Sequence, residues 1–354
     1  MAINRFFLTC IAASALAVPA LAQVPLDLPP GADDGQALLR ELPTDDGKAV
    51  DPAVVDAFAD AAAAYAAKDF ASARNAWEGL AAEGIGAAQF NLGFMFEHGR
   101  GSAPDYAAAV GWYRRAADAE IPAAMVNLAR LHFEGRGVAR DPATALHWLE
   151  SASALGSAVA AYNLGVAHLG APGTGVKKDA ETAARWFETA AERGHARAAY
   201  NLGVLYRDGD GVRRDTTRAE EYFAMAAENG DAVSHYALAD MMIARAGAKA
   251  GKKDVLARAA GHLREAAEAG VLVAQNRLAI MLAKGDGVKR DRETALMWFH
   301  VTAGLGAGNA AKNRDALAHI LSEDVRRRAA RRADAFRPQA PKGGTPGAKT
   351  WAKN

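Results

Sequence analysis

The chain has 354 residues, with 42 lysines and arginines against 41 aspartates and glutamates, and a formal net charge of +1 at pH 7. A nearly neutral chain lacks the strong positive field of general nucleic-acid binders, so we expect no nucleic-acid partner. The one cysteine, Cys10, lies in the first segment, which excludes a disulfide framework and thiolate chemistry from the rest of the chain. With 51% hydrophobic residues, a chain of this length can build a core by helix packing alone.

The N-terminal segment is typical of a secretory signal peptide. Arg5 is followed by about thirteen largely apolar residues and by an Ala-Leu-Ala cleavage pattern that ends at Ala22. Because a membrane span needs about 20 apolar residues, we expect cleavage of residues 1–22 and a periplasmic or secreted mature protein; an uncleaved anchor is the alternative. Residues 23–50 are rich in proline, glycine and aspartate, which predicts a weakly ordered acidic arm.

Residues 51–86 are expected to form a capping pair of helices before the regular part of the chain. The first helix is predicted over 52–67 and the second ends near Glu83. Each helix follows an aspartate, Asp51 or Asp69, whose carboxylate can accept hydrogen bonds from the free backbone N–H groups of the first turn.

The region from 87 to 306 repeats one pattern six times. The register is marked by four asparagines in steps of 36, 36 and 38 residues: Asn91, Asn127, Asn163 and Asn201. A period in this range indicates a solenoid in which each helix pair packs on its neighbours and the array displays a surface for partners. The six predicted repeats are 87–120, 123–156, 158–194, 196–230, 232–270 and 274–306.

Each repeat predicts two helices joined by a glycine turn. Small residues in the first helix, such as Ala199 and Gly203, let the neighbouring helix approach closely. The second helix begins at a capping aspartate, and these are Asp105, Asp141, Asp179, Asp215 and Asp291. The glycine pairs between the helices supply positive φ for the reversal and lack the Lys-Ser/Thr of a phosphate-binding loop; they are Gly99/Gly101, Gly135/Gly137, Gly173/Gly175, Gly209/Gly211 and Gly285/Gly287.

Aromatic residues recur at fixed places in the repeats. We expect the tryptophans at equivalent or adjacent positions to be core anchors, namely Trp77, Trp112, Trp148, Trp186 and Trp298. His132 and His168 replace aromatic residues of the other copies, so a packing role is favoured over a metal site, which needs further ligands at regular spacing.

The segment AAYNLGVLYRDGDGVRRDTTRAEEYFAMAAENG at 198–230 resembles a Sel1-like repeat, a tetratricopeptide-related helix pair. The resemblance rests on Asn-Leu-Gly, Gly-x-Gly-Val, the aspartate and the Trp/Tyr-Phe pair at matched spacings, and it covers 87–306. It implies an all-α fold, a right-handed superhelical solenoid of helix-turn-helix repeats. The fifth and sixth repeats depart from the pattern: Ala237 and Arg277 replace the asparagine, and the fifth carries a longer basic loop at 247–254 instead of the glycine turn.

The resemblance also implies that the first helix of each repeat lines a concave face that binds partners. An asparagine amide can both donate and accept, so a row of them suits an extended peptide; the alternative is a structural ladder that satisfies backbone groups of the adjacent repeat. Residues three and four apart share a helix face, which adds the downstream positions to the row. The candidate partner-binding residues are Asn91, His98, Asn127, Arg130, Glu134, Asn163, Asn201, Asp208 and Lys284, with Lys249, Lys252 and Lys253 as an accessory loop.

The C-terminal part is predicted as capping helices over 307–336 and a disordered basic tail over 337–354. The last helix begins at Ser322 with two acidic residues and continues with five arginines. This order of charges suits the helix dipole, so one interpretation is a solvated helix face. The other is a contact with an anionic partner, and this helix is the one place where we expect membrane contact.

No motif for catalysis is found: His-Glu-x-x-His, Gly-x-Ser-x-Gly, Ser-x-x-Lys and a dinucleotide fingerprint are all missing from the sequence. We therefore expect no enzyme activity, cofactor or metal. The resemblance implies a monomeric adaptor that binds a protein partner of the cell envelope on a preformed surface. The alternatives are a peptidoglycan- or β-lactam-binding or hydrolysing protein, which is suggested by cysteine-rich relatives, and a self-associating structural solenoid.

Overall fold

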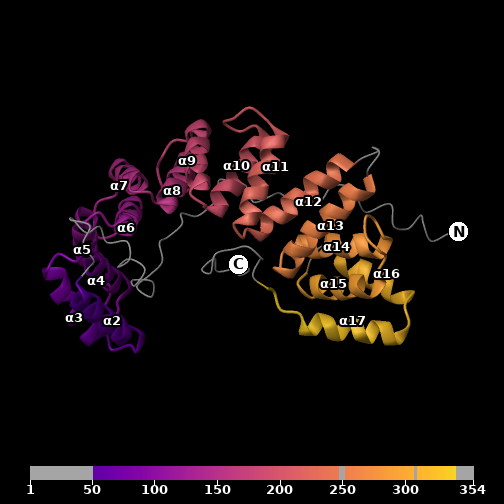
Figure 1. Ribbon diagram of the computed structural model, residues 1–354, viewed down its shortest axis with the longest axis horizontal. Helices are drawn as coiled ribbons and strands as arrows, with labels where there is room; N and C mark the ends of the chain where they lie inside the picture. Colours follow the sequence, from indigo (N-terminus) through magenta and orange to yellow (C-terminus); the bar gives the residue numbers. More distant parts are fainter. Residues whose placement is uncertain (1–50, 247–251, 307–308, 340–354) are drawn as a thin grey trace. The chain divides into compact units, whose positions relative to one another are not determined.

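A computed structural model describes residues 51–246, 252–306 and 309–339. All regular elements within these ranges are helices, which confirms the all-α prediction (Figure 1). None of the described helices is long and apolar enough to cross a membrane. The predicted signal peptide, the acidic arm, Lys249 and residues 340–354 lie outside the described residues. The chain divides into two compact units, Met1–Trp148 with Val166–Asp179 and Leu149–Gly165 with Ala180–Asn354.

The first unit contains the N-terminal helix pair and the first repeats, and its helices between residues 52 and 134 each pack on the next one along the chain. Its helices are α2 (Pro52–Ala66), α3 (Phe70–Ala82), α4 (Gly86–His98), α5 (Tyr106–Asp118) and α6 (Pro122–Glu134), while α7 (Pro142–Ala154) and α8 (Ala158–His168) cross the boundary between the units. Phe58 of α2 and Trp77 of α3 are fully buried, with ring centroids 6.2 Å apart. This aromatic contact joins the N-terminal pair to the core on which α4 packs.

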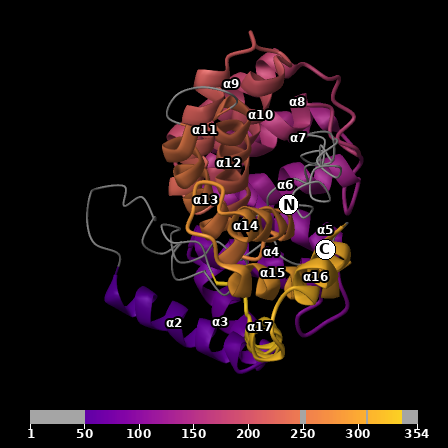
Figure 2. The ribbon, with the colours of Figure 1, turned by 90° about the vertical axis from the view of Figure 1, so that its right-hand side faces the viewer.

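The second unit continues the same helix pairs and ends in a helix that packs back on the array. Its helices are α9 (Ala180–Glu192), α10 (Ala196–Asp208), α11 (Thr216–Glu228), α12 (Ala232–Ala246), α13 (Lys252–Glu268), α14 (Leu272–Lys284), α15 (Arg292–Gly304), α16 (Ala310–His319) and α17 (Glu323–Ala335). Figures 1 and 2 both draw α17 alongside α15, and the two helices are in contact. Phe336 at the end of α17 meets the ring of Trp298 on α15 edge-on, at a centroid distance of 4.9 Å.

A glycine in the first helix makes room for an aromatic ring of the second helix. A Cβ atom placed on Gly165 would lie 2.6 Å from the ring of Phe187, and one on Gly203 would lie 2.8 Å from the ring of Phe223. Such distances are shorter than van der Waals contact, so the Asn-Leu-Gly motif keeps this position free of a side chain. In the fifth repeat Ala239 takes the place of the glycine and an aliphatic residue, Leu263, takes the place of the ring.

The glycine turns and the aspartate caps have the predicted geometry. Gly135 and Gly137 have φ angles of 69° and 70°, and a Cβ on Gly137 would lie 2.2 Å from the backbone oxygen of Tyr106. Gly137 is therefore required both for its φ angle and for the close approach of the preceding repeat. Carboxylates accept hydrogen bonds from the first turns of α5, α7, α11 and α15, and their residues are Asp105, Asp141, Asp215 and Asp291.

The tryptophan prediction is wrong for the three middle residues. Trp77 and Trp298 are buried, at 0% and 5% exposure, but the other three tryptophans are only half-buried. The buried side chain is instead that of the next residue: Tyr113 and Phe187 are 0% exposed, and Leu149 is 1% exposed. Because a helix turns through a full circle in 3.6 residues, neighbours along the chain face different directions, and the sequence spacing alone did not decide which of the two faces inward.

Candidate functional site

The four register asparagines do not form an exposed row. Their exposed fractions are 0% for Asn91, 6% for Asn127, 2% for Asn163 and 3% for Asn201. The expectation that these amides present themselves to a peptide on the surface is thus not met in this conformation. Asn127 interacts with the hydroxyl of Tyr113 in the neighbouring repeat, which is a side-chain partner and not the backbone group that the structural alternative expects. Both amide atoms of Asn91 lack a hydrogen-bond partner among the described residues.

The first unit contains a polar cluster, the Glu97 cluster, in which Glu97, Tyr113, Asn127 and Arg130 lie mostly in the interior and Glu134 lies at the exposed rim. The Arg130 guanidinium contacts Glu97 Oε1 through Nη2 and donates to Glu134 Oε2 at 3.2 Å through Nη1. The Tyr113 hydroxyl donates to Glu97 Oε2 at 2.9 Å. The side chains of Arg130 and Glu97 are only 12% and 7% exposed, so the predicted residue Arg130 belongs mostly to the interior.

The charges of the Glu97 cluster are coupled. Burial alone would lower the pKa of Arg130, but the carboxylates of Glu97 and Glu134 outweigh it, and the pKa lies above its ordinary value. Burial and then the Glu97 charge raise the pKa of Tyr113 well above its ordinary value. Arg130 therefore stays charged and Tyr113 stays a neutral hydrogen-bond donor. The cluster links α4, α5 and α6 through polar contacts as well as apolar packing.

Other predicted residues do lie at the surface. Glu134 is exposed at the rim of the Glu97 cluster, and Asp208 is exposed and holds Arg207 through two hydrogen bonds of 2.7 and 2.8 Å. The exposed His98 stacks on Phe94, with ring centroids 4.0 Å apart. Lys284 is half-buried at the end of α14, and Lys252 and Lys253 are exposed at the start of α13.

Sequence reasoning missed a second charged pair between successive first helices. Arg277 Nη1 donates to Asp240 Oδ1 at 2.5 Å, which links α14 to α12. Arg277 occupies the asparagine position of the sixth repeat, and Asp240 lies three residues after that position in the fifth. The sequence contained a signal of this pair, because Arg277 and Asp240 place a base and an acid at these two positions in neighbouring repeats. Two adjacent first helices in each unit are thus joined by an acid–base pair.

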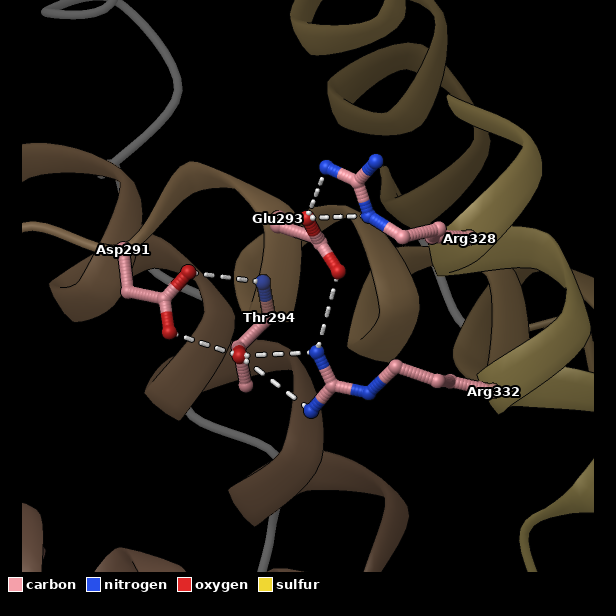
Figure 3. A network of polar contacts seen from close by, with 5 residues as sticks. All are labelled: Asp291, Glu293, Thr294, Arg328 and Arg332. Atoms are coloured by element: carbon pink, nitrogen blue, oxygen red, sulfur yellow. Dashed lines mark hydrogen bonds and ion pairs between the residues drawn. The ribbon is translucent and has the colours of Figure 1, made fainter. Parts of the chain in front are cut away.

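The arginines of α17 bind the start of α15, as Figure 3 shows. Arg328 donates to Glu293 Oε2 at 2.8 and 3.1 Å, and Arg332 lies 3.6 Å from Glu293 Oε1. Arg332 also donates to Thr294 Oγ1 at 3.3 Å, while that hydroxyl donates to the capping Asp291 at 2.7 Å. Part of the arginine run is thus used inside the molecule, which neither the solvated-face nor the anionic-partner interpretation predicted.

A histidine pair between α12 and α13 predicts pH-dependent stability. His235 and His262 place their Nδ1 atoms 3.0 Å apart, so one ring donates and the other accepts. Burial lowers the pKa of both; the charges of His235 and Arg258 lower that of His262 further, and Glu265 opposes the shift in both.

Because an unfolded histidine titrates near pH 6.5, the unfolded chain binds more protons just below that pH. The contribution of the two neutral histidines to the free energy of unfolding is therefore complete above about pH 6.5, and it is lost as the pH falls below that value. We expect the melting temperature to fall between pH 7.5 and 5.5, and to fall less in a H235Q/H262Q variant. An equal fall in both proteins would show that other groups are responsible.

Within the three described ranges, no group of three or more His, Cys, Asp or Glu side chains is arranged to hold a metal ion. His132 is buried at 5% exposure, and burial lowers its pKa. Its position among packed side chains agrees with its expected use as an aromatic substitute.

Comparisons with known proteins agree with the repeat architecture. The model of the Sel1 repeat family matches more than half of the chain, in six segments at 86–120, 122–157, 158–195, 196–231, 232–271 and 272–306. Among curated protein sequences none matches significantly.

Solved structures that are similar to this chain include three bacterial proteins. A Sel1 repeat protein from Oxalobacter formigenes is 29% identical, with a TM-score of 0.56, over 70% of this chain and 99% of that one. A protective antigen of uropathogenic Escherichia coli is 20% identical, with a TM-score of 0.38, over 75% and 87% of the two chains. An immunity protein from Pseudomonas aeruginosa is 19% identical, with a TM-score of 0.37, over 61% and 78%.

Proposed function

The chain belongs to the Sel1 repeat family, and from this premise we propose that it is an exported adaptor that binds a protein partner of the cell envelope. Sel1 repeat proteins are generally protein–protein interaction scaffolds, and their fold is typically non-catalytic. The signal-like sequence that ends at Ala22 supports the export part of the proposal. The proposed mechanism is reversible occupancy of a preformed surface by a monomer, without turnover.

One observation carries this proposal. All repeats but the fifth share the glycine turn and the aspartate that precedes the second helix, and each described second helix buries an aromatic or aliphatic residue. The residue seven positions after the register position differs in charge from copy to copy: it is His98 in the first repeat, Glu134 and Asp208 in the second and fourth, and Lys284 in the sixth. A scaffold that keeps its packing and varies its charged surface can select partners by electrostatic complementarity.

A variant pair tests this proposal. Arg130 is unsuitable because it is buried in the Glu97 cluster, so we choose the exposed acids and make E134Q/D208N. The matched control, E150Q/E228Q, removes two exposed acids from the second helices of the same two repeats. Each protein is crosslinked in the envelope of the cells that produce it.

The proposal expects one envelope protein to be recovered with wild type and with the control, and in clearly lower yield with E134Q/D208N. Equal recovery with wild type, E134Q/D208N and the control would show that the binding surface does not include these two positions of the first helices. Recovery of only further copies of the chain would favour the self-associating alternative. Recovery of wall glycan instead of protein would favour the peptidoglycan alternative.

A further inference from the structure

The second unit has a surface cavity whose lining is dominated by positive charge. Its volume is about 620 Å³, within the range of about 300–1,000 Å³ that is usual for small-molecule sites. It lies between α13, the end of α14 and the segment that leads into α15. The lining residues are Arg264, Leu282, Val288, Lys289, Arg290, Asp291 and Arg292.

The single acid of this lining is already engaged. The Asp291 carboxylate accepts from the backbone N–H of Thr294 at 2.9 Å and from its hydroxyl at 2.7 Å. Burial would raise the pKa of Asp291, but these hydrogen bonds and the charge of Arg332 hold it below its ordinary value. In the part of the chain that the structure describes, none of the four cations of the lining forms an ion pair or a hydrogen bond.

Comparison between repeats shows that the free guanidinium of Arg290 is unusual. Arg140 and Arg214 hold the same position, immediately before the capping aspartate, and each Nε donates to a backbone carbonyl of the preceding helix, at 2.9 and 3.0 Å. Arg290 forms no such bond among the described residues, and its side chain lines the cavity instead. The guanidinium at this position is hydrogen-bonded to the backbone in two other repeats, whereas in the sixth it is available to a ligand.

The side of the cavity that α13 provides also differs in charge from the equivalent place in the third repeat. Leu263 and Phe187 are equivalent buried residues, so Arg264 corresponds to Glu188 of the third repeat. Glu188 accepts a hydrogen bond of 2.9 Å from the Tyr222 hydroxyl. In the fifth repeat a base stands where the third repeat has an acid, and the local charge of the lining is reversed.

We propose that this cavity binds the phosphoryl group of an anionic ligand. The planar guanidinium groups of Arg264, Arg290 and Arg292 can each donate two parallel hydrogen bonds to phosphate oxygens, and Lys289 adds a point charge. Leu282 and Val288 provide an apolar wall for the non-polar part of the ligand. Either a soluble phosphorylated molecule or the headgroup of a phospholipid supplies this chemistry, and the proposal does not depend on the adaptor function.

The test compares two charge-matched variants of the full chain. K289Q/R290Q removes two cations from the cavity, and R213Q/R214Q removes the cations at the same two positions of the fourth repeat. Binding of pyrophosphate is measured by isothermal titration calorimetry, and binding to phosphatidylglycerol vesicles by sedimentation against phosphatidylcholine vesicles. Melting temperatures establish that the variants fold, and R264Q provides a second variant on a different helix.

The proposal predicts that K289Q/R290Q and R264Q each bind at least one of the two probes about tenfold more weakly than wild type, while R213Q/R214Q keeps its affinity. Binding of pyrophosphate identifies a soluble ligand, and binding of the anionic vesicles alone identifies a lipid headgroup. Equal weakening in the cavity variants and in the fourth-repeat control would show general charge attraction and would overturn the proposal. Failure of wild type to bind either probe would overturn it as well.

Discussion

Replacement of Arg130 by alanine is expected to lower the free energy of unfolding of the first unit by about 3–5 kcal/mol. The arginine side chain is 12% exposed and lies against Glu97, which is 7% exposed. Removal of the guanidinium leaves the Glu97 carboxylate buried beside Tyr113 without its cation. A buried charge without a partner is among the few causes of so large an effect from one substitution.

Urea denaturation of wild type, Arg130→Ala and the double variant R130M/E97L measures this effect. The double variant removes both charges, so it should recover most of the lost stability. The control is Arg207→Ala, which breaks the more exposed pair with Asp208, where side-chain exposures are 28% and 50%, and should cost less than about 1 kcal/mol. Equal losses for Arg130→Ala and Arg207→Ala would contradict the structural role of the Glu97 cluster.

A methyl group added at Gly203 is expected to destabilise the second unit by about 1–3 kcal/mol. The new Cβ would lie 2.8 Å from the Phe223 ring, which is fully buried and would have to shift. The second substitution Phe223→Leu should restore part of the loss, because the fifth repeat pairs Ala239 with Leu263 at these positions.

The matched control for Gly203→Ala is Gly261→Ala in the middle of α13. A Cβ at Gly261 meets nothing within 4 Å, so this change should stabilise the protein by about 0.4–1 kcal/mol through the unfolded state. The melting temperature, measured by circular dichroism, should therefore fall for Gly203→Ala and rise for Gly261→Ala. A shift of the same sign and size would mean that helix propensity, and not the space beside Phe223, decides the result.

The parts of the fold that depend on short spacings could be predicted from the sequence. The glycine turns, the aspartate caps and the helix pairs are set within a dozen residues, and Gly137 and Asp215 have the geometry that their motifs imply. Repetition of the pattern then fixed the number of units. The Sel1 family match to six segments confirms that number.

The candidate site was harder to predict because it depends on contacts between repeats. Whether Asn91 or Arg130 faces the interior is decided by the rotation of each first helix against the next, and that rotation is not encoded in local spacing. Glu97 was missed for this reason, since its partners Tyr113 and Arg130 lie 16 and 33 residues away. The paired change to Asp240 and Arg277 was the one visible signal of such a contact.

Photo-crosslinking from single positions in the intact envelope tests the central claim most directly. A crosslinking residue is placed at Glu134 or Asp208 on the first helices, and at Glu150 or Glu228 on the second helices of the same repeats. The adaptor account predicts that positions 134 and 208 capture the same envelope protein and that positions 150 and 228 do not. Capture of that protein from 150 and 228 alone, or of no protein from any position, would contradict it.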